Sequence, residues 1–279
     1  MRGLSAGANA QAVSDEELAR EGARLAAAPA SEVLAWAEAR FGAGAAIASS
    51  FAVEDVVLID LAARHAPSLR IFTLDTGRLP PETYEVMEAV RRRYGARIEA
   101  YFPERAPVEA LLREKGFFSF RQSIDARKEC CFIRKVEPLG RALAGRAAWA
   151  TGLRREQSVT RTLVEVLERD AGHGGIAKLN PLAAWTEAEV WGYAHKHRLP
   201  INALHGRGFP SIGCAPCTRA VAPGEDARAG RWWWESPEHK ECGLHVRALS
   251  PREDAASSRA DIAPSRADIA PSREEGSAP

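Results

Sequence analysis

The sequence contains no long hydrophobic run and carries almost no net charge. Its 279 residues are 46% hydrophobic, but no apolar stretch approaches the roughly 20 residues that a membrane-spanning helix needs. The formal net charge is +1, so there is no bulk field to attract nucleic acid or an anionic membrane. We therefore expect neither as a partner, and any anionic ligand must be held by a local group of Arg and Lys.

The start of the chain also lacks the features of a secretory signal, because residues 1–13 are small and polar with a single Arg. A cytoplasmic location is therefore expected. Thiols stay reduced in that compartment, so the five cysteines are expected to be ligands or nucleophiles rather than disulfide partners.

Short apolar segments alternate with helical patterns along most of the chain. We expect strands at residues 45–49, 70–74, 97–102 and 147–151, and helices at residues 14–28, 31–42, 54–65, 80–95 and 186–197. Alternation at this spacing predicts βαβ units. The expected fold is therefore α/β, with a parallel-stranded twisted sheet that is flanked by helices.

Three loops of small and polar residues follow predicted strands. They are Ser49-Ser50-Phe51, Leu74-Asp75-Thr76-Gly77 and Thr151-Gly152-Leu153-Arg154. Ligands of parallel sheets bind beyond the carboxyl ends of the strands, so three such loops at one edge predict a nucleotide pocket. Any one of them alone would be better explained as an ordinary turn between a strand and a helix.

The cysteines divide into two pairs and one single residue. Cys130 and Cys131 are adjacent, Cys214 and Cys217 form a Cys-Ala-Pro-Cys sequence, and Cys242 stands alone. Adjacent cysteines fit an ordinary zinc site poorly, whereas an iron–sulfur cluster accepts neighbouring thiolates because its irons lie close together. The pattern favours four cluster ligands and one free nucleophile, with a four-thiolate zinc site or a redox dithiol as the alternatives.

Basic residues accompany the cysteines along the sequence. They are Lys128, Arg134, Lys135, Arg219, Arg228 and Arg231. Their grouping favours an anion pocket beside the cysteines, although a solvated basic surface is the alternative, since Arg and Lys are mostly exposed in proteins.

Four segments together resemble the assimilatory adenylylsulfate (APS) reductases, which belong to the PAPS/APS reductase family. They are residues 128–139 around the first cysteine pair, 211–219 around the second, 224–235 with its Trp run, and Lys240-Glu241-Cys242-Gly243-Leu244-His245. Weaker matches occur at residues 49–55, 74–78 and 152–158. The resemblance covers roughly residues 45–246.

The resemblance implies a sheet of the PP-loop (adenine nucleotide alpha hydrolase-like) type. In that fold the first turn is normally rich in Ser and Gly and cradles a pyrophosphate on backbone amides. This chain has Ser50-Phe51-Ala52-Val53 there instead. The departure argues against ATP hydrolysis and agrees with APS, which contains one phosphate bonded to one sulfate.

The resemblance also implies a reaction, namely the thioredoxin-dependent reduction of APS to sulfite and AMP in assimilatory sulfate reduction. Cys242 would be the nucleophile and would carry a cysteine S-sulfonate intermediate. A [4Fe–4S] cluster would be bound by Cys130, Cys131, Cys214 and Cys217. The expected substrate-binding residues are Ser50, Phe51, Leu74, Thr76, Gly77, Lys135, Arg161, Arg228, Arg231 and His245.

These inferences divide the chain into four segments. Residues 1–42 are N-terminal helices, 43–205 the α/β nucleotide-binding and cluster domain, 206–250 a flexible cluster and catalytic segment, and 251–279 a tail. The tail repeats the seven residues 258–264 at 265–271. Each unit contains a Pro and only one large apolar residue, which favours disorder over a coiled coil.

Three other functions remain open at this point. A reductase for the 3′-phosphorylated substrate PAPS shares the sheet and the catalytic cysteine but typically lacks the two cysteine pairs. A PP-loop adenylating or tRNA-thiolating enzyme with a metal site would need the missing Ser-Gly-Gly loop, and it would carry a basic RNA-binding face. A non-enzymatic zinc-stabilised module would leave Cys242 without a role. The sequence also leaves open whether the chain forms a homo-oligomer.

Overall fold

The computed structural model describes residues 12–158, 161–236 and residue 244. The described residues belong to one compact unit that spans residues 1–246. The predicted catalytic Cys242, the predicted ligand His245, the leader and the repeat tail lie outside the described residues. The predicted domain boundaries at residues 42 and 205 stay predictions.

A six-stranded sheet forms the centre of the described unit. Its strand order is β3-β2-β1-β4-β6-β5, and every neighbouring pair is parallel except β5 and β6, which are antiparallel. The strands are β1 (Ala45–Ala48), β2 (Arg70–Leu74), β3 (Ile98–Tyr101), β4 (Ala148–Ala150), β5 (Leu167–Asp170) and β6 (Ile176–Leu179). The order reverses between β1 and β4, which is the position where open α/β sheets bind ligands.

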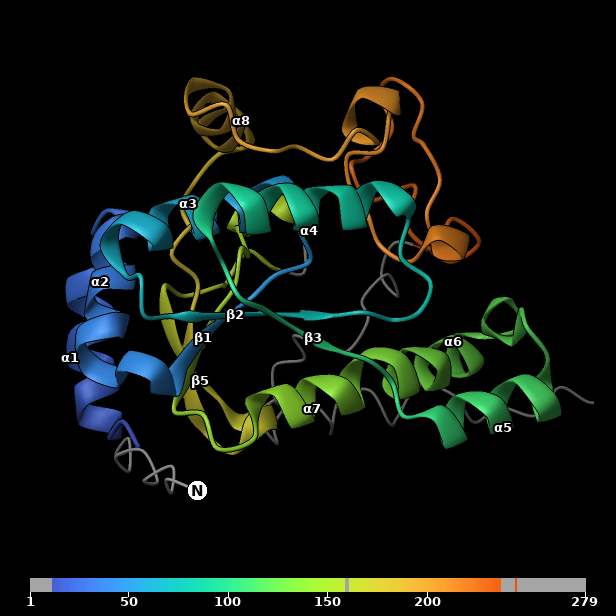
Figure 1. The fold of residues 1–279 in the computed structure, drawn as a ribbon, viewed down its shortest axis with the longest axis horizontal. Helices are drawn as coiled ribbons and strands as arrows, with labels where there is room; N and C mark the ends of the chain where they lie inside the picture. Colours follow the sequence, from blue (N-terminus) through green and yellow to red (C-terminus); the bar gives the residue numbers. More distant parts are fainter. Residues whose placement is uncertain (1–11, 159–160, 237–243, 245–279) are drawn as a thin grey trace, which may run out of the picture. The chain divides into compact units, whose positions relative to one another are not determined.

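Helices cover both faces of this sheet, and Figure 1 shows α3 and α4 on one side of β2 and β3, with α7 on the other. The α-helices are α1 (Asp15–Leu25), α2 (Ala30–Phe41), α3 (Val53–His65), α4 (Pro81–Tyr94), α5 (Arg105–Lys115), α6 (Ile124–Cys131), α7 (Glu137–Leu143) and α8 (Glu187–Lys196). The predicted α/β fold with a parallel sheet flanked by helices is confirmed, except that the edge strand β5 is antiparallel.

The side-chain alternation of the strands produces two apolar cores. Ile47 of β1 lies beside Ile71 of β2 and Ala150 of β4, and all three belong to the larger core beneath α2, α3 and α8. The intervening residues point to the opposite face. There Phe72 and Trp149 form a smaller core with Leu139, Ala142 and Leu143 of α7 and with Ala46.

The polypeptide between α6 and α7 is a π-helix, η3, that spans Phe132–Val136. It continues directly from the helix that carries the adjacent cysteines and leads directly into α7. A π-turn inserts an extra residue into a helix and is frequent at functional sites. In the helical segment from residue 124 to residue 143, the spacing of residues that share one face is therefore shifted by one residue after Cys131.

The predicted strands and helices are found with small shifts at their ends, but the sequence reasoning omitted five elements. These are α5, α6, α7, β5 and β6. β5 reads Leu-Glu-Arg-Asp, and only Leu167 is fully buried in it, so it lacks the apolar run expected of a parallel strand. It pairs antiparallel at the edge of the sheet, where polar residues are tolerated.

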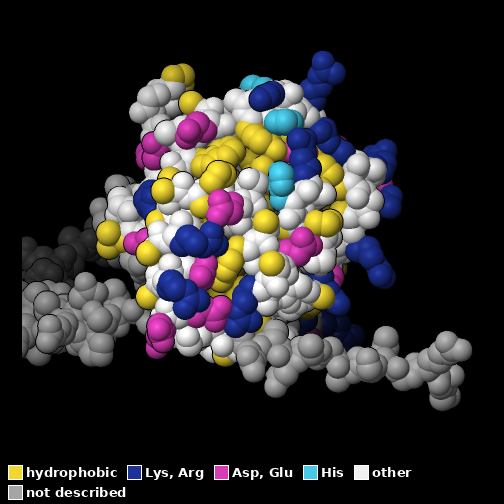
Figure 2. All heavy atoms as spheres, turned by 90° about the vertical axis from the view of Figure 1, so that its left-hand side faces the viewer, with side chains coloured by type: hydrophobic (Ala, Val, Ile, Leu, Met, Phe, Trp, Pro, Cys, Tyr) yellow, Lys and Arg dark blue, Asp and Glu magenta, His cyan; other side chains and the backbone are white. Residues whose placement is uncertain are grey.

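The surface near α1 and α2 mixes charges of both signs. Ion pairs there include Arg24 with Glu21 and Glu32, and Figure 2, which looks onto this side, shows basic and acidic side chains among hydrophobic ones. Within the described ranges, no helix combines the length and apolar character that crossing a bilayer would require.

Candidate active site

A pocket of about 360 Å³ opens at the carboxyl ends of β1, β2 and β4. We call it the strand-end pocket. Its walls come from the loops after these strands, from Lys135 and Leu139 on the helical segment below, and from residues 210–214 and 226–232. The position follows from the strand order, because the loops after β1 and β4 diverge at the point where the sheet changes direction.

The turn after β1 is held by a buried carboxylate. Oδ2 of Asp55 accepts hydrogen bonds from the backbone N of Ser50 at 2.6 Å and from its Oγ at 2.7 Å. Burial raises the pKa of Asp55 to about 6, although the hydrogen bonds from Ser50 oppose this shift. Gly152 packs against the same carboxylate, and a Cβ at that position would collide with Oδ1 of Asp55.

A second carboxylate ties the loop after β4 to the start of α3. Oε1 of Glu54 accepts from Nη2 of Arg154 at 2.9 Å and from Nε2 of Gln157 at 3.0 Å. Glu54 and Asp55 both stand in the first turn of α3, where helix amides normally attract an anion. The two carboxylates place negative charge at this end of the helix, which disfavours it as a phosphate cradle.

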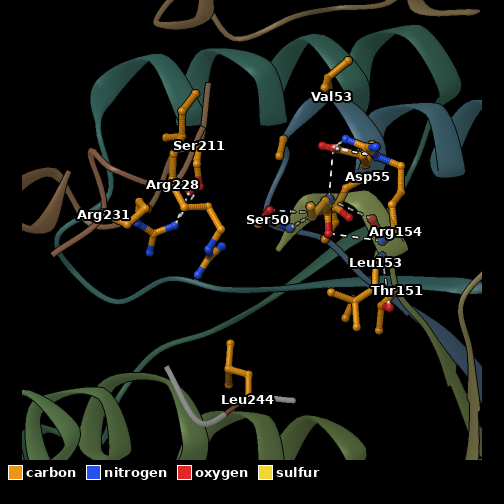
Figure 3. A pocket seen from close by; sticks show the side chains of 18 of the residues that line it. Ser50, Val53, Asp55, Thr151, Leu153, Arg154, Ser211, Arg228, Arg231 and Leu244 are labelled. Carbon is orange, nitrogen blue, oxygen red and sulfur yellow. Dashed lines mark hydrogen bonds and ion pairs between the residues drawn. The ribbon is translucent and has the colours of Figure 1, made fainter. Parts of the chain in front are cut away.

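Cationic side chains gather on a different side of the pocket. Figure 3 shows Arg228 and Arg231 together near Ser211, apart from Asp55 and Arg154. Arg231 is buried and donates from Nη1 to Oγ of Ser211 at 3.4 Å. Lys135 reaches the pocket from the π-helix. This side therefore offers the positive charge that a phosphate or sulfate group needs.

The four paired cysteines lie together beside this pocket. Cys130, Cys131, Cys214 and Cys217 are all buried, and they pack with Phe120 and Trp232 in one cluster. All four line a small second cavity, which we call the cysteine cavity. The two pairs come from the end of α6 and from the turn η8 (Ala215–Cys217), so the fold joins segments that are far apart in the sequence.

The two sites share a wall. Lys135, Cys214, Arg231 and Trp232 line both the strand-end pocket and the cysteine cavity. Thr76, at the end of β2, lines the pocket and lies with its Oγ1 3.3 Å from Sγ of Cys214. A group bound by the cysteines would therefore stand directly behind the cationic side of the pocket.

The pKa values of the thiols of Cys214 and Cys217 are shifted in opposite directions. Burial raises the pKa of Cys217 to about 12, with the neighbouring Cys214 as a further cause. Burial also acts to raise the pKa of Cys214, but Lys135, the Thr76 hydroxyl and nearby Arg side chains outweigh it, so that this pKa is lowered. Without a bound group, Cys214 is thus the thiol of this pair that ionises more readily.

A buried ion pair lies at the cysteine cavity and joins Arg127, which lines the cavity, to Glu235. Nε of Arg127 donates to the two carboxylate oxygens of Glu235 at 2.7 and 2.9 Å, and the two side chains are only 1% and 4% exposed. The guanidinium groups of Arg127 and Arg231 each lie 4.7 Å from the ring centroid of Trp232. These contacts fix residues 231–235 against the helix that carries Cys130.

The cavity also contains polar hydrogens without partners. Nε of Arg134, Nε of Arg231 and Nε1 of Trp232 are buried and lack an acceptor among the described residues, and all three side chains line the cysteine cavity. Buried donors normally have acceptors. An anionic group bound by the thiolates would supply them, so the residues present fit an iron–sulfur cluster.

A single metal ion, as in a four-thiolate zinc site, is the alternative occupant of this cavity. In the part of the chain that the structure describes, no three Cys, His, Asp or Glu side chains converge closely enough to hold one ion. The four thiols line one common cavity.

The predicted substrate-binding residues divide into three groups. Seven of them line the strand-end pocket: Ser50, Leu74, Thr76, Lys135, Arg161, Arg228 and Arg231. Phe51 and Gly77 are not among its lining residues. Phe51 has a positive φ of 59° and its ring is buried in the larger core, while Gly77 is held by Oδ1 of Asp75. His245 lies outside the described residues.

Sequence reasoning did not assign roles to several residues of this pocket. Asp55, Glu54 and Arg154 shape its walls through the hydrogen bonds above, while Trp191 and Ser211 line it from distant segments. Asp55 could have been found from the sequence, because it is an acidic residue in the first turn of the helix that follows the Ser50 turn. Nothing in the local sequence distinguishes Trp191, on α8, from an ordinary core residue.

Comparisons with known proteins agree with this geometry. The sequence profile of the phosphoadenosine phosphosulfate reductase domain matches residues 44–220. The adenosine 5′-phosphosulfate reductase of Allochromatium vinosum is 55% identical over 209 residues, which are 75% of this chain and 81% of that protein. The enzyme of the same name from Burkholderia cepacia is 53% identical over 204 residues, covering 73% and 81%.

A solved structure is also similar. The phosphoadenylyl-sulfate (PAPS) reductase of Candida auris, in its phosphate complex, superposes with a TM-score of 0.64 at 27% identity. The match covers 76% of this chain and 99% of that one.

Proposed function

This chain belongs to the phosphoadenosine phosphosulfate reductase family, and on that premise we propose that it reduces adenosine 5′-phosphosulfate (APS) to sulfite and AMP. Its relatives at 55% and 53% identity carry the name of APS reductase. The observation that carries the assignment is the wall shared by the cysteine cavity and the strand-end pocket, formed by Lys135, Cys214, Arg231 and Trp232.

The substrate would bind across the ends of the strands. Ser50, Leu74 and Thr76 line the part of the pocket that follows β1 and β2, and they suit the adenosine. Lys135, Arg228 and Arg231 would hold the phosphosulfate, with Arg161 as a further contact. Positive charge at this place stabilises the AMP phosphate as its charge increases during the reaction.

Cys242 is the proposed nucleophile. Its thiolate attacks the sulfur of APS, an S–S bond forms, and the bond between sulfur and the bridging oxygen breaks as AMP leaves with the electron pair. The products of this step are AMP and an S-sulfonate on Cys242. Nearby cations, with His245 as a candidate, would lower the pKa of the attacking thiol.

A dithiol protein, thioredoxin by analogy with the family, would complete the reaction. One of its thiolates attacks Sγ of Cys242 and releases sulfite, and its second thiol then resolves the mixed disulfide. The electrons come from the two thiols of the reductant. We place this reaction in sulfate assimilation in the cytoplasm, and the oligomeric state stays open.

Cys130, Cys131, Cys214 and Cys217 would hold a [4Fe–4S] cluster. When bound, the cluster supplies a fixed charge distribution and structural support next to the sulfate. The buried N–H groups of Arg134, Arg231 and Trp232 would be available as donors to it, and Lys135 lines both this cavity and the strand-end pocket.

The proposal is tested by the variant Cys242→Ser. Anaerobically purified wild type should release AMP and sulfite from APS with thioredoxin, and mass spectrometry should detect sulfonated Cys242 before the reductant is added. The variant should bind AMP and keep its iron but form no adduct. Sulfite release by the variant at the wild-type rate would refute the role of Cys242.

Substrate preference has its own measurement, because the chain also resembles a PAPS reductase in structure. The two substrates differ by a 3′-phosphate on the ribose. The two buried cysteine pairs favour APS, so kcat/KM should be higher for APS than for PAPS. A preference for PAPS would assign the chain to the other branch of the family.

A further inference from the structure

The loop that follows β2 connects the strand-end pocket to both cysteine segments. Thr76 lines the pocket, and its Oγ1 lies 3.3 Å from Sγ of Cys214. The carbonyl oxygen of Thr76 accepts from Nη1 of Arg134 at 2.7 Å, on the π-helix that follows the adjacent cysteines. The carbonyl oxygen of Arg78 accepts from the backbone N of Ala215 at 2.8 Å, inside the Cys-Ala-Pro-Cys sequence. The position of this loop therefore affects both sites.

Asp75 closes a turn in this loop. Its Oδ1 accepts from the backbone N of Gly77 at 2.8 Å, the contact by which an aspartate commonly fixes a turn. Gly77 has a positive φ of 68°, which a glycine adopts without strain. Asp75 is buried, and its backbone N donates to the carbonyl oxygen of Tyr101 on β3 at 2.9 Å. The direction in which Thr76 faces thus depends on the carboxylate of the residue before it.

The carboxylate of Asp75 is held in turn by Tyr84. The hydroxyl of Tyr84, in the first turn of α4, lies 2.9 Å from both carboxylate oxygens of Asp75 and donates to them. Neither side chain is among those that line the strand-end pocket or the cysteine cavity, and the proposed mechanism gives neither a role. A residue in this place influences a site through the groups that it orients.

The hydroxyl of Thr76 is the group that this arrangement orients. Its Oγ1 accepts from the backbone N of Arg78 at 3.2 Å, so its own hydrogen can point toward Sγ of Cys214. A hydroxyl has a single hydrogen to donate, and a small rotation of the turn would direct it elsewhere. Because hydrogen-bond partners of the ligands tune the affinity of a metal site, a loosened turn would weaken the binding of a cluster as well as the fit of the pocket.

We infer that Tyr84 is a positioning residue, which acts through Asp75 to fix the turn that presents Thr76 to Cys214 and to the strand-end pocket. The inference rests on the proposed function for the identity of the two ligands, the nucleotide in the pocket and the cluster in the cysteine cavity. One hydroxyl on α4 would thus influence how firmly both of them are held.

The same helix offers a matched control. Tyr94, in the last turn of α4, donates its hydroxyl to Oδ1 of Asp60 at 2.8 Å, so the two contacts have the same chemistry. Neither Tyr94 nor Asp60 is among the residues that line the strand-end pocket or the cysteine cavity. Tyr84→Phe and Tyr94→Phe each remove one hydroxyl and keep the ring, so both variants should fold. A general loosening of α4 would appear in both.

The test uses full-length protein purified without oxygen. Tyr84→Phe should contain about as much iron as wild type, but an iron chelator should remove this iron several times faster. The dissociation constant for AMP should rise about threefold, the size of effect expected from the loss of one hydrogen bond. KM for APS should rise with it, by more than kcat falls. Tyr94→Phe should match wild type in each of these measurements.

A double variant tests the route through Asp75. If Tyr84 acts through this carboxylate, adding Tyr84→Phe to Asp75→Ala should change the rate of iron loss no further, whereas independent effects would add. Additive effects would therefore overturn the inference. If Asp75→Ala does not fold, the comparison of Tyr84→Phe with Tyr94→Phe decides alone.

Two further results would overturn the positioning role. The first is that Tyr84→Phe equals wild type in its rate of iron loss and in its affinity for AMP. The second is that Tyr94→Phe changes both measurements as much as Tyr84→Phe does, which would make Tyr84 a stabilising residue of α4 and nothing more. If wild type releases no sulfite from APS, the proposed function fails, and the rates of iron loss still decide whether Tyr84 positions the turn. If wild type contains no iron, the AMP affinities decide instead.

Discussion

The strand-end pocket and the cysteine cavity share a wall but are constructed differently. The pocket takes its form from the ends of β1, β2 and β4, and the turn after β1 is held by hydrogen bonds from Ser50 to Asp55. The cavity joins the end of α6 to residues 214–235, and three buried donors around it lack acceptors among the described residues. The strand ends thus form a pocket whose turns are fixed by the sheet, whereas the cavity depends on contacts between segments that are far apart in the sequence.

This difference predicts that loss of a cysteine ligand has the largest effect. Cys217→Ala should lower iron from about four atoms per chain to nearly none, because a [4Fe–4S] cluster uses all four thiolates. Its unfolding free energy should fall more than that of any other variant here, since binding of such a group contributes to folding.

The measurement is iron and acid-labile sulfide per chain, together with denaturant unfolding, after anaerobic purification. Cys242→Ser serves as the control and should keep its iron. Zinc in place of iron in the wild type, or full iron in Cys217→Ala, would contradict the assignment of the cavity.

The next largest effect should come from the buried ion pair at the cysteine cavity. Glu235→Gln removes the carboxylate charge that faces the buried Arg127 and should lower the unfolding free energy by about 3–5 kcal/mol. Glu88→Gln is the matched control, because Glu88 pairs with Arg91 at 2.7 Å on the surface and should change stability by less than about 1 kcal/mol. Equal losses in both variants would show that burial of the first pair has no energetic consequence.

A smaller effect is expected in the pocket, from the pH dependence of Asp55. Its pKa in the folded protein is raised to about 6 by burial, above that of the unfolded chain. Its contribution to stability is therefore present below the unfolded pKa and is lost as the pH rises through about 6. The total is about 3 kcal/mol, of which about half is lost between pH 5 and pH 8.

Asp55→Asn removes this titration. The stability of wild type minus that of the variant should therefore decrease from pH 5 to pH 8 in denaturant unfolding. A difference that stays constant or increases over this range would mean that Asp55 is ionised throughout.

The fold was predictable where the sequence pattern was local. The strands β1, β2, β3 and β4 and the helices α1, α2, α3, α4 and α8 follow from apolar runs and caps such as Thr186, whose side chain accepts from the backbone N of Glu189 at 3.2 Å. β6 was not predictable, because its four residues include Lys178, which is buried only through its pairing with Glu168 at 2.8 Å. That pairing becomes visible only in three dimensions.

The site was predictable where residue types are rare. The two cysteine pairs and the nearby Lys135, Arg228 and Arg231 could be grouped from the sequence, and the structure places them around the cysteine cavity and the strand-end pocket. Phe51 could not be placed, because only its positive φ turns the ring into the core. The donors of Trp232 and Arg134 could not be found either, since a missing acceptor is a property of the folded structure.

The π-helix at Phe132–Val136 has a consequence for how the chain tolerates insertions and deletions. Each residue of an α-helix turns the next by about 100°, whereas a π-turn takes up one additional residue in nearly the same rotation. Removing one residue there would restore regular helical spacing and leave α7 facing Phe72 and Trp149 as before. Removing two residues would exceed what the π-turn absorbs and would rotate Leu139 away from these neighbours. This five-residue segment therefore provides one residue of tolerance to deletion between the cysteines and α7.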